Sequence, residues 1–309
     1  MIPTSLRQLL DATQDQRLDT WQGRQVWLAR EPWGELVVSL QGAQVLHFLP
    51  APKAERLPAS DTERLPEVDA TSVAPQGWLW MTPTPQPVPD AIRGGIPLCW
   101  PWFANESPDG QGVMHGPARK AQWRLDATDE HEDGIELHLS PEIRLHEQLA
   151  PRAVIQANAQ RLHVELITEH RGTTPVKLTG ALHTYLQVSH AHRCNLEGLA
   201  GARYLDKLKG FAEGVQQGEP GIRGAIDRIY QSNNEVVLDD GERRLRIAKQ
   251  GSDSTVVWHP DRELPPDTPV DVGYHFLCIE AACTRLDPVW LVPDAQHLLA
   301  TTISRENTP

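Results

Sequence analysis

Two short segments of this chain concentrate residues that could bind a polar or anionic ligand. They are residues 92–103 (IRGGIPLCWPWF) and residues 115–119 (HGPAR). Arginine offers a planar fork of donors to anionic or polyhydroxyl groups. Gly94 and Gly95 allow the backbone to approach a bound group closely or to adopt positive φ, and the prolines stiffen the residues after them. The alternative interpretation is a tight turn with surface arginines.

An ionisable pair is the second chemical signal. Glu280 lies in an otherwise apolar stretch, residues 276–283 (FLCIEAAC), where burial would raise the pKa of its carboxyl group. His183 lies in a similar stretch, residues 179–186 (TGALHTYL), and an imidazole titrates near neutral pH. Taken singly, each residue is more often a hydrogen-bonded core residue than a catalytic group.

These segments belong to an ordered set of motifs. The others are LHTY at residues 182–185, YLDKL at 204–208, DRIY at 227–230, VVWHP at 256–260 and CIE at 278–280. The set resembles the hexose-6-phosphate mutarotases, the glucose-6-phosphate 1-epimerase branch of the aldose 1-epimerase (galactose mutarotase-like) superfamily. A lone RGG or a lone histidine would be a weak signal, but here the motifs follow the family's order over most of the chain.

The resemblance implies a reaction and a set of roles. Anomers interconvert when the C1 hydroxyl loses a proton while the ring oxygen gains one, after which the ring opens, rotates about C1–C2 and closes. One base and one acid suffice, with no metal or organic cofactor. By resemblance, Glu280 is the base and His183 the acid, whereas His115 and Asp206 contact sugar hydroxyls. For Asp206 the alternative is an ordinary exposed ion pair with Lys207.

Two arginines, Arg93 and Arg119, would separate phosphorylated from free sugars. Arginine binds phosphate through paired charge-assisted hydrogen bonds. These are stronger than the hydrogen bonds that it can form with the hydroxyls of a neutral hexose. An arginine matching Arg93 also occurs in family members that act on free sugars, so Arg119 discriminates better. Met114 departs from the glutamine that some relatives carry before HG, a difference that bears on fine specificity. The predicted substrate is a hexose 6-phosphate, D-glucose 6-phosphate above others.

Two other functions fit the same motifs. One is an aldose 1-epimerase that acts on free hexoses, and the other is a non-catalytic sugar-phosphate-binding protein with the same fold. The presence of both His183 and Glu280 favours an enzyme. Anomerisation rates for glucose and glucose 6-phosphate would separate the three functions.

Composition and charge disfavour several classes of partner. The chain has 41 acidic and 29 basic residues, a formal net charge of -12, which argues against nucleic acid or an anionic membrane surface as the main partner. An anionic small molecule remains compatible. No apolar run is long enough to span a membrane, and the first residues lack a secretory pattern. We therefore expect a cytoplasmic protein that is a monomer or a weak dimer.

The cysteines and histidines form no familiar metal-binding pattern. The four cysteines lack CxxC spacing and are few for 309 residues, which predicts reduced, buried thiols. The spacing of His183, His190 and His192, and that of His163 with His170, matches no usual zinc arrangement. We predict no metal site.

Alternation of apolar and polar residues predicts mainly β-structure. Residues 35–40 and 44–49 flank a Gln-Gly-Ala turn and are typical of a hairpin. Residues 135–139 and 162–166 alternate as half-buried strands do. The segment with the strongest helical pattern is residues 5–13, and long helices are not expected, because 22 glycines and 26 prolines interrupt the chain too often.

The larger organisation follows from length and resemblance. We expect loops over residues 50–76 and 213–224, and one domain over residues 1–309, with about the first 20 as an N-terminal cap, since β-sandwiches often use this length for one domain. The resemblance implies a large antiparallel β-sandwich of the galactose mutarotase-like type with a few short helices. Four tryptophans could either stack on a sugar or fill the core: Trp78, Trp80, Trp100 and Trp102.

Overall fold

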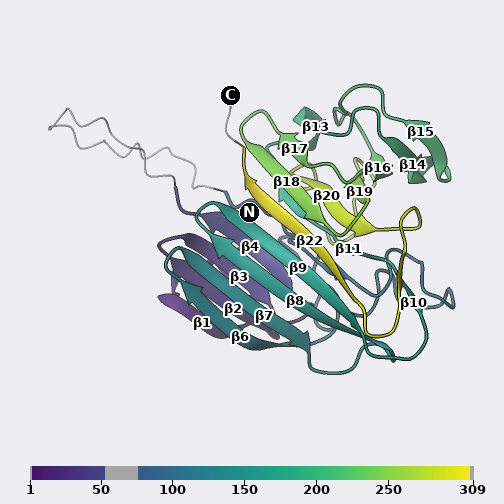
Figure 1. Ribbon diagram of the computed structural model, residues 1–309. Coiled ribbons are helices and arrows are strands. Elements are labelled where there is room, and N and C mark those ends of the chain that lie inside the picture. Colours follow the sequence, from purple (N-terminus) through teal and green to yellow (C-terminus); the bar gives the residue numbers. More distant parts are fainter. Residues whose placement is uncertain (1, 53–75, 307–309) are drawn as a thin grey trace.

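The computed structural model describes residues 2–52 and 76–306 and is built almost entirely from antiparallel sheets (Figure 1). Most of the loop predicted over residues 50–76 lies outside the described residues. The sheets confirm the antiparallel β-sandwich, and the few helices are short, as predicted. Within the described ranges, no helix is long and apolar enough to cross a membrane.

Three sheets and a ribbon make up the described part of the molecule. The four-stranded sheet has the order β1 (Asp15–Trp21), β2 (Arg24–Glu31), β3 (Gly34–Ser39), β4 (Gln44–Pro50). The long sheet has the order β13 (Asn195–Glu197), β17 (Val236–Asp239), β18 (Arg244–Gln250), β22 (Gln296–Arg305), β9 (Arg161–His170), β8 (Leu149–Asn158), β7 (Gly134–Pro141), β6 (Trp123–His131).

The central sheet has the order β15 (Ala212–Val215), β14 (Arg203–Asp206), β16 (Ile226–Gln231), β19 (Ser254–His259), β20 (Phe276–Cys283), β11 (Gly180–Leu182), β5 (Leu98–Cys99), with β12 (Tyr185–Gln187) also paired to β20. The ribbon joins β10 (Val176–Leu178) to β21 (Val289–Leu291). The helices are α1 (Thr4–Asp11) and the 3-10 turns η1 (Ala191–Arg193) and η2 (Lys207–Lys209).

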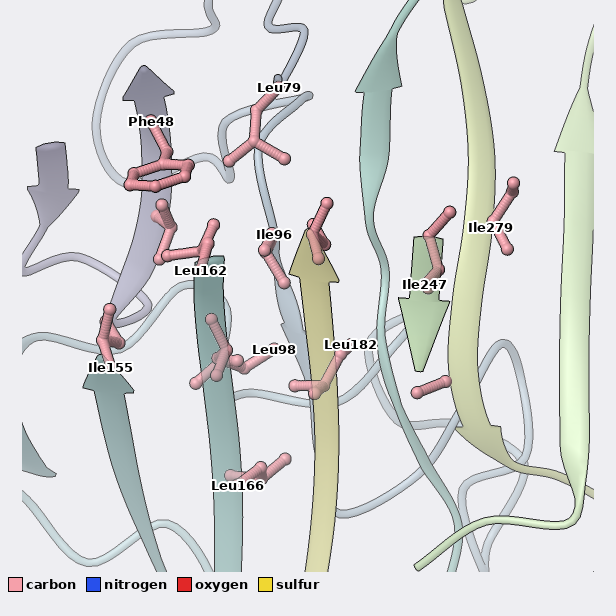
Figure 2. Close-up of a cluster of buried hydrophobic side chains, with 14 of the residues drawn as sticks. Phe48, Leu79, Ile96, Leu98, Ile155, Leu162, Leu166, Leu182, Ile247 and Ile279 are labelled. Atoms are coloured by element: carbon pink, nitrogen blue, oxygen red, sulfur yellow. The ribbon is translucent and has the colours of Figure 1, made fainter. Parts of the chain in front are cut away.

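The main core lies between the long sheet on one side and the other two large sheets on the other (Figure 2). Phe48 of β4 and Ile279 of β20 pack in the same cluster as Leu162 of β9. Strands β7 and β9 contribute alternate side chains, so the half-buried strands predicted at residues 135–139 and 162–166 are confirmed. Burial of this apolar surface is the main force that holds the layers together.

The N-terminal helix α1 covers the far side of the four-stranded sheet. Leu6 and Leu10 are one helical turn apart and fully buried against Trp21 and Val37. The helix matches the one predicted over residues 5–13 to within two residues at each end. The hairpin predicted around the Gln-Gly-Ala turn is also confirmed, as β3 and β4 pair antiparallel across it.

The loop predicted over residues 213–224 is partly wrong, because β15 occupies its first residues. This edge strand has mostly exposed side chains, so it lacks the apolar alternation that would reveal it, and backbone pairing with β14 holds it. Gly214 permits close contact with Tyr204, since a Cβ there would lie 2.5 Å from the ring. Three of the tryptophans, Trp78, Trp80 and Trp100, are buried, which favours the core interpretation for them.

Candidate active site

Strand β20 divides its side chains between two faces. Leu277 and Ile279 enter the main core, whereas Cys278 and Glu280 point to the opposite face of the central sheet. Glu280 lies opposite Val256 of β19, and its side chain is only 1% exposed. The strand order therefore places a carboxyl group in the middle of a sheet, where water has little access.

His183 reaches this carboxyl group from the turn between β11 and β12. Its backbone N–H donates to the carbonyl of Pro97 (3.0 Å), and the carbonyl of Thr184 accepts from the N–H of Ile279 (3.2 Å). These bonds fix the turn against β20 and β5. As a result, His183 Nδ1 lies 3.5 Å from Glu280 Oε1, and the His183 side chain is 9% exposed.

Neither group of the pair is fully hydrogen-bonded. His183 Nδ1 and Glu280 Oε2 are buried and have no hydrogen-bond partner among the described residues. Buried polar atoms without a hydrogen-bond partner are rare in folded proteins. A bound ligand that supplies the missing hydrogen bonds would account for these two.

His115 faces the pair from the loop that follows β5. Its φ is 67°, a left-handed conformation that is uncommon outside glycine. Two backbone bonds hold it there, from His115 N–H to the Ala104 carbonyl (2.8 Å) and from Trp100 N–H to the His115 carbonyl (3.2 Å). Its Nδ1 accepts from the Ala104 N–H, so Nε2 carries the proton. The ring meets His183 edge-on, with centroids 5.5 Å apart.

The glycines of the RGG motif serve the close backbone approach predicted for them. Gly94 and Gly95 have φ of 116° and 60°, and a Cβ on Gly95 would lie 2.0 Å from the Val45 carbonyl oxygen. This packing directs Arg93 toward Tyr185, whose hydroxyl accepts from a terminal N–H of Arg93 (3.3 Å). The Tyr185 ring in turn stacks on His183 at 4.8 Å and 9°.

Arg119 is the unpaired cation of the site. Within residues 2–52 and 76–306 it has no ion-pair or hydrogen-bond partner, and its Nε is buried. Its positive charge is felt by His115, His183 and Glu280 alike, as the pKa shifts of all three groups include it. Five of the predicted site residues are thus brought together: Arg93, His115, Arg119, His183 and Glu280.

The electrostatics favour neutral forms of the buried groups. Burial raises the pKa of the Glu280 carboxyl well above its usual value. Burial, with help from His115 and Arg119, lowers the pKa of His183 well below its usual value. The pKa of His115 falls to about 3, mainly through burial and then through Arg119. The pKa shifts of the carboxyl group and of the two imidazoles are opposite in sign, and each favours the uncharged form of its group.

Asp206 has different neighbours from those five residues. In the register of the central sheet, Leu205 shares the face of Glu280, so Asp206 at the next position points to the other face. There its carboxylate lies 3.4 Å from Arg228 Nε and 3.8 Å from Lys209 Nζ. Its contact with a sugar hydroxyl stays a prediction.

Asp227 is the aspartate that the register does bring to the Glu280 face. It pairs across to Trp258 of β19, which pairs to Cys278 of β20. Lys207 Nζ lies 2.8 Å from its Oδ2, while its Oδ1 is buried without a hydrogen-bond partner among the described residues. Burial raises the pKa of Asp227 despite Lys207. Reasoning from the sequence missed this residue, although strand alternation within DRIY carries the signal.

Other places that could hold a ligand lie away from this group. Cavities of about 660 and 610 Å³ are lined by none of the predicted site residues. Among the residues that the structure describes, one set of possible metal ligands lies within 4.8 Å of one another on the β6–β7 hairpin, formed by Asp129, Glu136 and His138. The four cysteines are buried and free, as predicted.

Comparison with known proteins assigns the chain to a family. The model of the family described as aldose 1-epimerase matches residues 26–304. A protein of Escherichia coli named "Putative glucose-6-phosphate 1-epimerase" is 29% identical over 255 residues, which cover 79% of this chain and 78% of that protein. A protein of Cenchrus ciliaris with the same name is 29% identical over 231 residues, covering 66% and 68%.

Solved structures show the same fold. A "putative mutarotase" from Salmonella typhimurium superposes with a TM-score of 0.79 at 24% identity, covering 96% of this chain and 95% of that one. The galactose 1-epimerase of Lactobacillus acidophilus superposes with a TM-score of 0.66 at 12% identity, covering 95% and 99%. The fold is thus that of the galactose mutarotase-like proteins, and the chain belongs to the aldose 1-epimerase family.

Proposed function

We propose that this protein interconverts the α and β anomers of a hexose 6-phosphate, with D-glucose 6-phosphate as the preferred substrate. Glu280 and His183 exchange protons with O1 and the ring oxygen, Arg119 binds the phosphate, and Arg93 and His115 bind the sugar. The observation that carries the proposal is a buried acid–base pair next to an arginine without a counterion among the described residues.

The opposite pKa shifts of Glu280 and His183 support the acid–base step. Mutarotation needs one group that takes a proton from O1 while another gives one to the ring oxygen. A carboxyl group with a raised pKa and an imidazole with a lowered pKa can take these two roles. Return of the proton after rotation about C1–C2 closes the ring with the opposite anomer. When sugar hydroxyls donate to Glu280, they stabilise its carboxylate, which favours Glu280 as base and His183 as acid.

The free charge of Arg119 supports a phosphorylated substrate. A guanidinium that has no protein counterion can give its full charge and two parallel hydrogen bonds to a phosphate. The names of the Escherichia coli and Cenchrus ciliaris proteins point to the same substrate for those relatives.

Contacts with the neutral part of the sugar are assigned to groups around the pair. The protonated Nε2 of His115 is a donor that stays neutral at physiological pH. The unpartnered Oδ1 of Asp227 is an acceptor on the same face as Glu280. A donor and an acceptor near the pair can orient the ring for proton transfer.

The decisive experiment compares glucose with glucose 6-phosphate by exchange NMR, in the wild type and in Arg119→Ala. We expect kcat/KM to be much higher for glucose 6-phosphate in the wild type. Arg119→Ala should lose on the order of 2 to 5 kcal/mol of transition-state stabilisation toward the phosphorylated sugar, and much less toward glucose.

The alternatives give different results in the same experiment. Equal kcat/KM for the two sugars, or equal proportional losses in Arg119→Ala, would identify an epimerase of free hexoses. Binding of both sugars without any anomerisation would identify a non-catalytic sugar-binding protein.

A further inference from the structure

Trp102, unlike the neighbouring Trp100, is not buried in the core. It is partly exposed, and its indole N–H donates to the Val113 carbonyl at 2.8 Å, which fixes the orientation of the ring. Together with Trp290 it lines a cavity of about 610 Å³, the tryptophan cavity. None of the five residues gathered around the acid–base pair lines this cavity. Its volume is typical of a site for a small molecule.

The ribbon of β10 and β21 brings Trp290 and a lysine to this cavity. The main core holds one face of the ribbon through four apolar side chains: Val176, Leu178, Val289 and Leu291. On the other face, Trp290 lies directly opposite Lys177 in the strand register. Trp290 is 65% exposed. The core thus anchors the ribbon, while an indole ring and an ammonium group lie side by side on its free face.

Glu106 gives the cavity an acceptor without a partner. Its Oε1 accepts from Arg285 Nε at 2.9 Å, but Oε2 is buried and has no hydrogen-bond partner among the described residues. The Arg285 guanidinium also lies over the Phe211 ring, 4.0 Å from its centroid, so both members of the ion pair are held in place. Since buried polar atoms are nearly always hydrogen-bonded, Oε2 is suited to accept from a bound molecule.

The lining of the cavity combines three surfaces that a sugar ring can match. Trp290 offers an apolar ring face, Glu106 an acceptor, and Lys177 a donor that has no ion-pair partner in the described part of the chain. The C–H face of a pyranose packs on an indole, and its hydroxyls both donate and accept. A phosphate would be repelled by the Glu106 carboxylate. A purely apolar ligand would leave Oε2 without a hydrogen bond.

From this combination we propose that the tryptophan cavity is a second saccharide site, which binds a neutral pyranose with its ring on Trp290 and its hydroxyls on Glu106 and Lys177. The site is separate from the acid–base pair. Trp102 lines the cavity, whereas the next residue, Phe103, packs on the His115 ring with centroids 5.2 Å apart. Binding in the cavity therefore does not depend on the proposed function.

The test uses three neutral glycosides whose blocked O1 prevents ring opening: methyl α-D-glucopyranoside, methyl β-D-glucopyranoside and methyl β-D-galactopyranoside. Saturation-transfer NMR and tryptophan fluorescence on the full chain measure their binding, and at least one should bind. Trp290→Ala should weaken that binding about tenfold, because the stacking surface is lost. Trp290→Phe keeps an aromatic face and should recover most of the loss.

Further variants test the polar contacts and the location. Glu106→Gln and Lys177→Met each remove one charged partner of the hydroxyls and should each weaken binding about tenfold. Leu18→Ala is the matched control for Trp290→Ala, because Leu18 is 56% exposed on β1 and does not line the cavity. Arg119→Ala alters the candidate active site. Both Leu18→Ala and Arg119→Ala should bind the glycosides as the wild type does.

Several results would overturn the proposal. They are no binding of any of the three glycosides, wild-type binding in Trp290→Ala, or an equal loss in Arg119→Ala, which would place the glycosides in the candidate active site. Binding of adenosine or inorganic phosphate in their place would assign the cavity to another ligand. A dimer that dissociates in Trp290→Ala, seen by sedimentation without glycoside binding, would make the ribbon a contact between copies. If Trp290→Ala does not fold, Lys177→Met and Glu106→Gln carry the same comparison.

Discussion

Two glutamates of this protein lie beside a buried histidine, Glu280 fully buried and Glu35 with its side chain 13% exposed, yet their surroundings make them opposite kinds of group. Glu35 of β3 has both carboxylate oxygens bonded: Arg7 reaches one at 2.7 Å and the other at 2.8 Å, and His47 Nε2 lies 3.1 Å from the second. Glu280 lies 3.5 Å from His183 and keeps one oxygen without a partner among the described residues.

The pKa values follow from these partners. Burial alone would raise the pKa of Glu35, but hydrogen bonds from Arg7 and His47 lower it to about 2. At Glu280 burial is the largest influence, and it outweighs the nearby positive charges of Lys207 and Arg119, so the pKa rises. Glu35 is thus a permanent anion that fastens α1 to the four-stranded sheet, whereas Glu280 can hold or release a proton. Burial of a glutamate next to a histidine does not by itself make the two glutamates alike. Glu280 differs from Glu35 in that one of its oxygens has no hydrogen-bond partner among the described residues.

The largest expected effect is on the anomerisation rate, which should depend on Glu280 and not on Glu35. Glu280→Gln keeps the shape of the side chain and removes its exchangeable proton, so the anomerisation rate should fall by about 10²- to 10⁴-fold. Glu35→Gln is the matched control and should leave the rate unchanged. Exchange NMR on both purified variants, with circular dichroism to verify folding, measures this. A wild-type rate in Glu280→Gln would remove Glu280 from the mechanism.

The loss of stability should have the reverse order, larger for Glu35→Gln than for Glu280→Gln. Glu35→Gln leaves the Arg7 guanidinium without its main counterion, and we expect the free energy of unfolding at neutral pH to fall by about 1 to 3 kcal/mol, since the site is partly exposed. Urea unfolding of the variants measures it. Glu280→Gln should be no less stable than the wild type. The comparison would fail if Glu35→Gln unfolded at the same urea concentration as the wild type.

The pH dependence of stability should have opposite signs at the two sites. Glu280 has a raised pKa, so above pH 4.5 the folded state binds more protons than the unfolded state. The wild type should then lose stability relative to Glu280→Gln as pH rises toward the folded-state pKa, by at most about 1.4 kcal/mol per pH unit. The stability that Glu35 contributes is complete above pH 4.5 and is lost as pH falls toward 2.

Urea unfolding of the wild type and both Gln variants across this pH range tests both signs. A difference between the wild type and Glu280→Gln that stays constant above pH 4.5 would mean that the Glu280 carboxyl ionises normally in the folded protein.

The smallest expected effect lies at the exposed end of the Glu35 cluster. Asp11 also contacts Arg7, at 2.6 Å, but its side chain is 52% exposed. Exposed helix pairs of this kind contribute little, so Asp11→Asn should lower the free energy of unfolding by about 0.3 to 0.5 kcal/mol. Thermal unfolding at low and high salt would detect it. A loss as large as that of Glu35→Gln would show that Asp11, and not Glu35, holds α1.

Local sequence patterns were enough to predict the class of fold and the hairpin of β3 and β4, because alternation and turn residues report on short-range structure. They were also enough to single out Glu280, whose charge interrupts an apolar run. Edge strand β15 was missed for the converse reason, since its exposed, polar side chains resemble a loop and its pairing with β14 is what makes it a strand.

The choice between two aspartates shows what local patterns leave open. Asp206 and Asp227 lie in similar motifs beside a cation, and only the pairing of β14, β16, β19 and β20 decides which of them shares the face of Glu280. The Arg93–Asp267 contact joins residues 174 positions apart and has no local signal at all. Both facts depend on long-range register, which the order of motifs along the chain does not contain.

The division of side chains between the two faces of β20 limits the insertions and deletions that this strand can accept. Because Ile279 and Glu280 are neighbours that lie in the core and beside His183 respectively, deletion or insertion of one residue between Phe276 and Glu280 would exchange them. A carboxyl group would enter the main core while an isoleucine faced His183, so we expect that folding and the proposed activity would be lost in one step. Length variation should therefore be confined to the loops, and an engineer who wishes to alter the substrate should substitute residues on loops and leave the spacing of this strand untouched.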